Sequence, residues 1–190
     1  MLEGIHKIHL IGIGGSGMRA IANILIQKGY EVSGSDVKES DVIERFRQMG
    51  ATVHIGHNAD YVQGVDAVVR STAIREDNPE IVAAKEQGIT ILHRSDIVKA
   101  VLDVTNGIAV AGAHGKTSTT SMIGQILVEG QMEPTVIIGG EVDYLKGSSC
   151  LGKGEYSVVE ADESDGSFLK LRPKTIVITN IDCLLYTSDA

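Results

Sequence analysis

The chain has 190 residues and a mass of 20.2 kDa, which is enough for one large domain or two small ones. Apolar residues make up 43% of it and charged residues 22%, values typical of a packed globular protein, which excludes a wholly disordered chain. The net charge of -8 without any cluster of Lys and Arg argues against nucleic-acid binding, and no apolar run approaches the roughly 20 residues of a membrane span.

The first half of the chain alternates between short apolar runs and stretches with helical spacing. A run at 7–11 predicts a buried strand, and apolar residues spaced along 16–28 predict a helix that Gly29 ends. Asp41 with Glu44 resembles a capping box at the start of another helix. Further strands are expected at 30–33, 52–55, 67–70 and 89–92, and further helices at 41–49, 78–87 and 95–102. Strands alternating with helices favour a parallel, doubly wound sheet with right-handed crossovers.

Around residues 103–107 the same pattern starts again. A strand at 108–111 leads through a glycine-rich loop into a helix at 117–129, and two more buried strands are expected at 156–159 and 175–179. The two halves share no closer self-similarity, so they are two folds and not a repeat array. We expect an α/β protein in which a Rossmann-like parallel-sheet domain, residues 1–104, precedes the start of a P-loop-type ATP-binding α/β domain, residues 105–190.

The first glycine loop follows the strand at 7–11 directly. Its glycines match G-x-G-x-x-G, a pattern that combines a tight turn, close backbone approach to a diphosphate and helix N–H groups aimed at the anion. Asp36 follows the second strand, where an acidic residue often holds a ribose hydroxyl. The glycines could instead serve only close packing of helix on strand, and the motif alone does not separate NAD, FAD or a UDP-sugar. The residues of this loop are Gly12, Gly14, Gly15, Ser16 and Gly17.

The second glycine loop ends in Gly-Lys-Thr between a strand and a helix. In a P-loop, backbone N–H groups cradle phosphates, the lysine reaches the β and γ oxygens, and the threonine hydroxyl can bind Mg²⁺. The usual spacing would place a glycine at position 110, which is Val110 here, so this is a shorter form of the loop. The alternative is a helix start without a ligand. The candidate residues are Gly112, Ala113, His114, Gly115, Lys116, Thr117 and Ser118.

An acidic cluster follows the strand at 156–159. Mg²⁺ in nucleotide sites is held by a few oxygen ligands together with phosphate oxygens. Glu160, at the very end of the buried strand, is the first choice for a metal ligand, whereas Glu163 and Asp165 also fit a solvated acidic loop. Cys150 and Cys183 form neither a disulfide framework nor a zinc site, and nothing supports thiol chemistry.

Taken together, these segments resemble the Mur ligase family. The resemblance runs from about His6 to about Asp182 and rests on several motifs in the family's order. It implies a first domain that binds a UDP-sugar, a central domain that binds ATP and Mg²⁺, and a third domain for the incoming amino acid that these residues do not include. The segments that carry the resemblance are 9–18, 34–36, 71–74, 112–117 and 160–168.

The resemblance also implies residue roles. The first loop together with Met18 would hold the UDP diphosphate, and four residues would contribute to the uridine end: Asp36, Ser71, Thr72 and Ala73. Lys116 would bind the ATP phosphates, and Thr117 and Glu160 would coordinate Mg²⁺. His114 would shape the cradle or contact the substrate beside Lys116 in the catalytic set, and a purely structural role for His114 is equally compatible.

The implied reaction is the ATP-dependent joining of L-alanine to the lactyl carboxylate of UDP-N-acetylmuramate through an acyl phosphate, in peptidoglycan synthesis. The alternatives are the sister activity that attaches a recycled tripeptide, and an NAD-dependent oxidoreductase that uses the first loop alone. No signal-peptide layout is visible, so we expect a cytoplasmic protein.

The sequence departs from the family at several positions. Ala113 stands where the family usually has Thr, and Arg19 replaces a small residue. After Asp182 the family continues into a segment whose histidine binds a second metal, and residues 183–190 do not match it, so we expect a non-native tail there. We therefore expect these 190 residues to bind nucleotides without completing the reaction.

Overall fold

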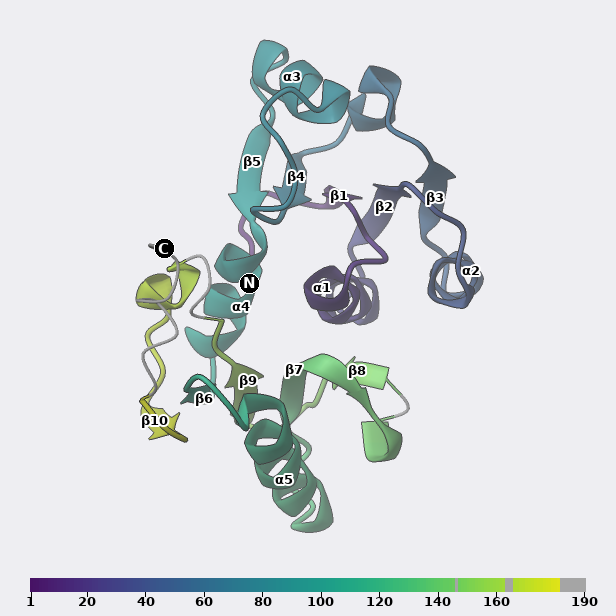
Figure 1. Cartoon of the computed structure of the whole chain (residues 1–190). Coiled ribbons are helices and arrows are strands. Elements are labelled where there is room, and N and C mark those ends of the chain that lie inside the picture. Colours follow the sequence, from purple (N-terminus) through teal and green to yellow (C-terminus); the bar gives the residue numbers. More distant parts are fainter. Residues whose placement is uncertain (146, 163–165, 182–190) are drawn as a thin grey trace. The chain divides into compact units, whose positions relative to one another are not determined.

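The computed structural model describes residues 1–145, 147–162 and 166–181. It divides into two compact units, Met1–Ile97 and a second that begins at Val98 (Figure 1). The division falls inside helix α4 (Arg94–Leu102), slightly before the boundary that we propose at 104/105. The expected non-native tail lies outside the described residues.

The first unit is built on a five-stranded, all-parallel sheet with the order β3-β2-β1-β4-β5. The chain moves outward from β1 to β2 and β3, and then returns to the other side of β1 with β4 and β5. This order places a topological switch point between β1 and β4, where ligands of open α/β sheets bind beyond the carboxyl ends of the strands. The strands are β1 (Lys7–Ile11), β2 (Glu31–Asp36), β3 (Thr52–Ile55), β4 (Ala67–Arg70) and β5 (Thr90–His93).

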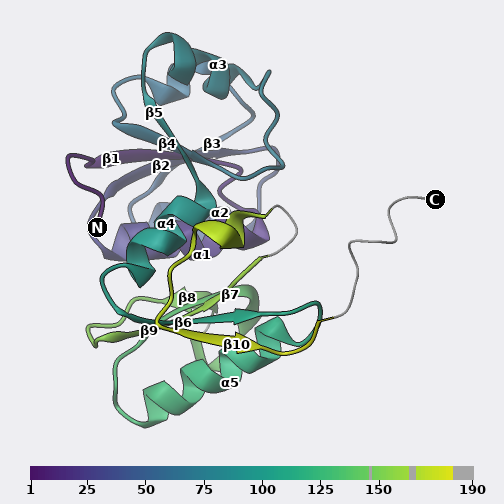
Figure 2. The ribbon, with the colours of Figure 1, turned by 90° about the vertical axis from the view of Figure 1, so that its left-hand side faces the viewer.

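Helices cover both faces of this sheet, as a doubly wound fold requires. Helices α1 and α2 lie on one face and α3 on the other (Figures 1 and 2). Three helices end on a glycine with positive φ: Gly29 after α1, Gly50 after α2 and Gly88 after α3. In each case the N–H groups of the glycine and of the residue after it donate to carbonyl oxygens of the last helical turn, for example Gly29 N to Ile26 O at 3.0 Å. These bonds close the helix. The helices are α1 (Ser16–Gln27), α2 (Asp41–Gln48), α3 (Pro79–Glu86) and the 3₁₀ turn η1 (Ala59–Val62).

The start of α2 corrects one expectation. Asp41 is not the capping residue, because the side chain of Ser40 accepts the hydrogen bond from the N–H of Ile43 at 3.4 Å. Ser40 has extended backbone angles, whereas Asp41 is the first helical residue. Asp41 and Glu44 both lie in the first turn, where their negative charge is favourable at the positive end of the helix dipole. The acidic pair therefore marks the first turn, one residue after the cap.

The core of the first unit is aliphatic on both faces of the sheet. One cluster, on the face covered by α3, joins strand residues Ile11 and Val68 to Ile81 of α3, all fully buried. On the other helix layer, Ile21, Ile24 and Leu25 of α1 are buried, as their spacing predicts. Burying a side chain of this size is worth about 1.5–3 kcal/mol, so these residues fix the helices against the sheet.

The second unit contains a five-stranded mixed sheet with the order β10-β6-β9-β7-β8. Strands β10, β6, β9 and β7 are parallel to their neighbours, and β8 pairs with β7 in the antiparallel direction. Strands β7 and β8 were not predicted from the sequence. β8 (GSSC) has no apolar run, whereas β7 begins with an apolar, β-branched run at residues 135–138 that is itself a strand signal. The strands are β6 (Asn106–Ala111), β7 (Thr135–Val142), β8 (Gly147–Cys150), β9 (Tyr156–Glu160) and β10 (Thr175–Ile178). The 3₁₀ turns are η2 (Asp143–Leu145) and η3 (Ser167–Lys170).

Helix α5 (Lys116–Glu129) covers one face of this second sheet (Figure 2). Its Ile123 packs on a buried cluster formed by Val110, Val136 and Val158 from three adjacent strands, together with Ile138.

The predicted α/β class is confirmed in both units; the first sheet is all-parallel, and the second is parallel except for β8. The strand expected at 175–179 forms as β10 but is not buried as predicted, because it is the edge strand and leaves Ile176 and Ile178 exposed. No helix within the described ranges has the length and apolarity needed to cross a membrane.

Candidate functional site

The first glycine loop is held by the backbone of β2. The carbonyl oxygen of Ser35 accepts hydrogen bonds from both Gly12 N at 2.8 Å and Ile13 N at 3.0 Å. Gly12 has a φ of +73°, a conformation that glycine adopts without strain, and Gly15 N then bonds to Gly12 O at 3.0 Å. The chain thus turns sharply from β1 into α1, whose first residue is Ser16.

Two of the glycines lie close to charged side chains. A Cβ atom at Gly14 would lie 2.9 Å from Oδ2 of Asp36, and one at Gly17 would lie 2.8 Å from Nη1 of Arg94. A larger residue at either position would displace the end of that side chain, so these two glycines allow Asp36 and Arg94 to approach the loop. Gly15 and Ser16 are exposed at the start of α1, where helix N–H groups favour an anion. The loop thus combines these two glycines with an exposed helix start.

Asp36 lies at the carboxyl end of β2 and faces the loop. Its Oδ2 accepts a hydrogen bond from Gly14 N at 2.8 Å, and its Oδ1 lies 3.4 Å from Lys38 N. Since one carboxylate oxygen is engaged by the loop itself, Asp36 fixes the loop's shape in addition to any contact with a ribose hydroxyl.

The turn at 71–74 lies beside the same loop. It follows β4, and Cδ1 of Ile74 is 3.4 Å from the position of a Cβ at Gly12. Ser71 O accepts a hydrogen bond from Ile74 N at 3.2 Å, while Thr72 and Ala73 are exposed. The structure therefore brings the turn and the glycine loop together at the switch point between β1 and β4.

Met18, expected to contact the diphosphate, does not lie at the surface of the glycine loop. Its side chain is 3% exposed and belongs to the core, and its N–H donates to Gly15 O at 2.9 Å within the helix. Neither the side chain nor the N–H of Met18 is available to a ligand, so the proposed ligand contacts do not include Met18.

Two arginines to which the sequence patterns assign no role lie against the first loop. Arg94, the first residue of α4, places its guanidinium beside Gly17, and Nε of Arg19 donates to Gly14 O at 2.7 Å. Their positive charge is complementary to a diphosphate at the start of α1. The sequence contains no spacing signal for Arg94, because it lies far along the chain and only the parallel sheet brings it to the loop.

The second glycine loop joins β6 to α5 and has the strand-to-helix geometry expected of a phosphate cradle. Gly112 and Gly115 have φ values of +136° and +79°, and Lys116 is the first residue of the helix. Nζ of Lys116 donates to Gly112 O at 2.6 Å, which holds the ammonium over the loop. Ala113 lies within the loop, and Ser118 is exposed in the first turn of α5.

Thr117 and Glu160 meet although they are 43 residues apart. The Thr117 hydroxyl lies 3.2 and 3.1 Å from the two carboxylate oxygens of Glu160, which ends the neighbouring strand β9. Gly139 N of β7 donates to Oε2 of Glu160 at 2.8 Å, and a Cβ at Gly139 would lie 3.0 Å from this oxygen. A hydroxyl and a carboxylate therefore converge at the end of the sheet, beside Lys116.

The residues that follow β10 hold the loop from its other side. Oδ1 of Asn180 accepts from His114 N at 3.1 Å, and Nδ2 of Asn180 donates to His114 O at 2.9 Å. The Thr179 hydroxyl also donates to His114 O, at 2.6 Å. These contacts fix the backbone of His114, which is an exposed residue. The sequence analysis assigned no role to Thr179 and Asn180.

The donors available for a metal are few. Within the described residues no group of three or more His, Cys, Asp or Glu side chains converges on a metal position. Thr117 and Glu160 are an oxygen pair, which suits Mg²⁺ when phosphates and waters complete its coordination. The acidic residues Glu163 and Asp165, and the position at which the family's second metal ligand is expected, lie outside the described residues.

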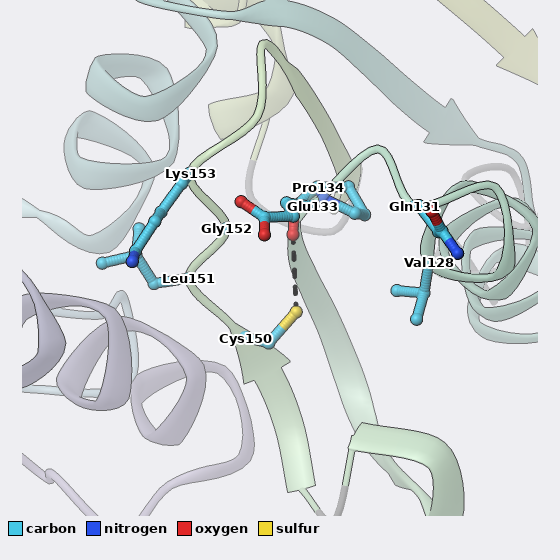
Figure 3. Close-up of a pocket in the computed structure, with 8 residues that line it drawn as sticks. All are labelled: Val128, Gln131, Glu133, Pro134, Cys150, Leu151, Gly152 and Lys153. Atoms are coloured by element: carbon cyan, nitrogen blue, oxygen red, sulfur yellow. Dashed lines mark hydrogen bonds between the residues drawn. The ribbon is translucent and has the colours of Figure 1, made fainter.

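A separate cavity of about 340 Å³ lies near the α5–β7 connection, at the amino end of β7 (Figure 3). It contains Cys150, whose Sγ lies 3.5 Å from Pro134 O. Burial raises the pKa of the Cys150 thiol, which disfavours the reactive thiolate. Since both glycine loops follow the carboxyl ends of strands, this cavity belongs to neither of them. Its lining residues are Val128, Gln131, Glu133, Pro134, Cys150, Leu151, Gly152 and Lys153.

Comparison with known proteins links this chain to one family. The sequence profile described as "Mur ligase family, catalytic domain" matches residues 7–104. A protein of Desulfatibacillum aliphaticivorans named UDP-N-acetylmuramate–L-alanine ligase is 49% identical over 177 residues, which are 93% of this chain. The chain spans only 39% of the length of that relative.

Solved structures agree with this match. The UDP-N-acetylmuramate–alanine ligase of Thermotoga maritima superimposes with a TM-score of 0.86 at 36% identity, over 93% of this chain and 42% of that one. The UDP-N-acetylmuramate:L-alanyl-γ-D-glutamyl-meso-diaminopimelate ligase of Neisseria meningitides gives 0.87 at 28% identity, over 94% and 61%. With the profile covering more than half of the 190 residues, the chain belongs to the Mur ligase family.

Proposed function

We propose that this chain is the nucleotide-binding part of an ATP-dependent ligase that joins L-alanine to the lactyl carboxylate of UDP-N-acetylmuramate in peptidoglycan synthesis. The observation that carries the proposal is the convergence of Lys116, Thr117 and Glu160 at the carboxyl edge of the second sheet. The names of the relatives support the substrates, and because the chain spans 39% of the compared relative, the complete reaction is proposed for a longer protein.

In this proposal the first unit binds the UDP-sugar. The exposed start of α1, at Gly15 and Ser16, would receive the diphosphate, with the guanidinium of Arg94 next to it. Asp36 and the turn at 71–73 would lie toward the uridine, since they lie at the ends of the strands on either side of β1. Met18 takes no part, because it is buried.

The second unit would bind ATP with Mg²⁺. Lys116 and the N–H groups of the loop formed by residues 112–117 would hold the phosphates. The Thr117 hydroxyl and the Glu160 carboxylate meet at 3.1 Å, and both supply the oxygen ligands that Mg²⁺ takes in proteins. The donor pair therefore fits this ion, which when bound would neutralise phosphate charge during transfer.

The chemistry follows from the weak electrophilicity of a carboxylate. A lactyl carboxylate oxygen would attack the γ-phosphorus of ATP, releasing ADP and forming an acyl phosphate. The amine of L-alanine would then attack the acyl carbon, and the amide would form with loss of inorganic phosphate and a proton. Carboxylate and triphosphate repel each other, so Lys116 and the backbone N–H groups would offset the charge of both as they approach.

The other candidate activities differ in what they explain. An NAD-dependent oxidoreductase would use the first loop but would leave Lys116 and Glu160 without a role. The tripeptide-attaching activity shares both nucleotide sites, and the Neisseria meningitides structure is as similar in fold as the alanine ligase. The higher sequence identity to the alanine ligase, 36% against 28%, favours alanine.

Calorimetry on the 190-residue chain tests the proposal. We expect UDP-N-acetylmuramate and Mg-ATP to bind, each with a stoichiometry of one, and NADH not to bind. Tight binding of NADH without binding of the UDP-sugar would replace the ligase by the oxidoreductase. We also propose a cytoplasmic location, because the reaction consumes ATP, and we expect no alanine-dependent ATP hydrolysis by these 190 residues alone.

A further inference from the structure

The first unit contains a buried carboxylate that the proposed chemistry does not use. Glu80, in the first turn of α3, is 0% exposed. Its Oε2 accepts a hydrogen bond from the Ser35 hydroxyl at 2.7 Å and lies 3.1 Å from Nε2 of His9, which is also 0% exposed. Its Oε1 lies 3.1 Å from Nδ1 of His57 and 3.3 Å from Asn58 N. Four donors thus surround one carboxylate and match its acceptor capacity.

This arrangement keeps Glu80 ionised. Burial by itself raises the pKa of the Glu80 carboxyl, but hydrogen bonds from His9 and Ser35, followed by the charge of His9 and a bond from His57, outweigh burial and lower the pKa below its ordinary value. The titratable groups that face Glu80 are His9 from β1 and His57 from the segment after β3. His9 is itself held by Ser33 of β2, with Nδ1 2.9 Å from the hydroxyl.

Ser35 connects this cluster to the first glycine loop. The side chain of Ser35 is fixed by Glu80, and the backbone carbonyl of the same residue accepts the N–H groups of Gly12 and Ile13. The next residue, Asp36, then accepts from Gly14 N. A shift of Ser35 would therefore move both anchors of the loop at once.

We propose that Glu80, supported by His9 and His57, is a positioning residue that sets the shape of the first glycine loop through Ser35. The inference rests on the proposed function in that this loop is taken to bind the UDP diphosphate. Helix N–H groups bind an anion well only when the loop geometry is fixed. Glu80, which lies in α3, would therefore change the affinity for the ligand without touching it. The polar residues His9, Ser33 and Ser35 occupy strand positions that would otherwise carry the apolar core.

Glu80→Gln in the 190-residue chain tests this role. The change keeps the side-chain volume but replaces an acceptor oxygen by an NH₂ group, which faces donors. We expect amide hydrogen exchange at Gly12 and Ile13, followed by NMR, to become about tenfold faster relative to the amides of β4, the factor expected when one hydrogen bond is weakened. Glu86→Gln, at an exposed position of the same helix, is the matched control and should change the exchange rates neither of the loop amides nor of the β4 amides.

The selectivity of the effect separates positioning from general stability. A merely structural Glu80 would speed exchange equally at the loop and in β4, and that result would overturn the inference. Ser35→Ala provides a second variant, because it removes the hydroxyl that bonds to Glu80 and lies 3.1 Å from Nδ1 of His57, and leaves His9, His57 and Asn58 beside Glu80. It should loosen Gly12 and Ile13 in the same selective way, and unchanged exchange there in a folded Ser35→Ala chain would equally contradict the proposal.

Calorimetry on the same proteins ties the loop to its ligand. We expect Glu80→Gln to weaken UDP-N-acetylmuramate binding about tenfold and to leave Mg-ATP binding unchanged, since a loosened loop must be ordered on binding. If the wild-type chain did not bind the UDP-sugar, the proposed function would fail, while the exchange experiment would still decide the role of Glu80.

Discussion

At the scale of single residues, the second glycine loop depends on three side chains with different tasks. Lys116 supplies a positive charge over the loop, Thr117 a hydroxyl and Glu160 a carboxylate. The two oxygen donors come from different elements: Glu160 ends the parallel strand β9, and Thr117 lies in the first turn of α5, directly after the loop that follows β6. Replacing one of these side chains should therefore weaken the binding of ATP or of its Mg²⁺ and leave the binding of UDP-N-acetylmuramate unchanged.

Lys116→Ala should weaken ATP binding about 10- to 100-fold, because a charged hydrogen bond to phosphate is worth about 1.5–3 kcal/mol. Binding of UDP-N-acetylmuramate should not change, since the first glycine loop belongs to the other unit. Calorimetry measures both, with Lys153→Ala, an exposed lysine of the same unit, as the control. Equal loss of both ligands would contradict the two-site layout.

Glu160→Gln should weaken Mg-ATP binding more than the binding of ATP in the presence of EDTA. The amide keeps the size of the carboxylate but loses the charge that a divalent cation needs. Titrations with and without Mg²⁺ give the two affinities, and Glu129→Gln at an exposed position of α5 is the matched control. If both ATP forms lost affinity by the same factor, Glu160 would not be a metal ligand.

At the scale of elements, helix α5 must lie close to β7 to bring its first turn next to the sheet. Gly124 permits this approach, because a Cβ there would lie 2.4 Å from the hydroxyl of Tyr144 and 3.2 Å from Cγ1 of Val136, which is fully buried. Burial raises the pKa of the Tyr144 hydroxyl, as expected for a phenol that packs against the helix. Packing at Gly124 therefore contributes to the position of the loop at the start of α5.

Gly124→Ala should destabilise the second unit although alanine is the better helix former. The gain in helix propensity is about 1 kcal/mol, whereas forcing a methyl group into a packed core costs about 1–3 kcal/mol. Chemical denaturation measures the free energy of unfolding, with Gln125→Ala at the neighbouring exposed position as the control. Adding Tyr144→Phe should restore part of the loss, and a simple gain in stability from Gly124→Ala would contradict the packing argument.

At the scale of the whole molecule, the same junction occurs twice. Each unit has a parallel strand followed by a glycine loop and a helix, with a carboxylate from a neighbouring strand bonded to the loop or to the helix start. The first junction has Asp36 and two arginines, and the second has Lys116, Thr117 and Glu160. The difference in charge supports different nucleotides: a diphosphate at the first and a metal-bound triphosphate at the second.

Hydrogen exchange with mass spectrometry on the full chain should locate the two ligands. UDP-N-acetylmuramate at about 100 times its Kd stabilises by about 2.7 kcal/mol, and we expect the new protection around the β1–α1 junction. Mg-ATP should protect the β6–α5 junction in the same way. ADP-ribose, which shares the diphosphate but not the uridine or the muramate, is the control for the first ligand. Protection of one and the same loop by both nucleotides would refute the assignment of two sites.

Local sequence patterns were enough to predict the alternation of strands and helices, both glycine loops and the family, because these features depend on apolar periodicity, glycine positions and motif spacing. Strands β7 and β8 were not predicted: β8 (GSSC) has no apolar run and is a strand through its pairing with β7, whereas the apolar run of β7 at residues 135–138 was overlooked. The predicted cap of α2 was one residue late, since Ser40 and Asp41 are both residue types that cap helices and only the backbone angles distinguish them.

The contacts between residues far apart in the sequence became apparent in the three-dimensional fold. Parallel strands bring their carboxyl ends to one edge, so Glu160 reaches Thr117, Asn180 reaches His114 and Arg94 reaches Gly17 across long stretches of sequence. The burial of Met18 and the four donors around Glu80 depend on which face of a helix or strand packs inward. Such contacts are set by sheet order and packing, which the spacing of residues along the chain does not encode.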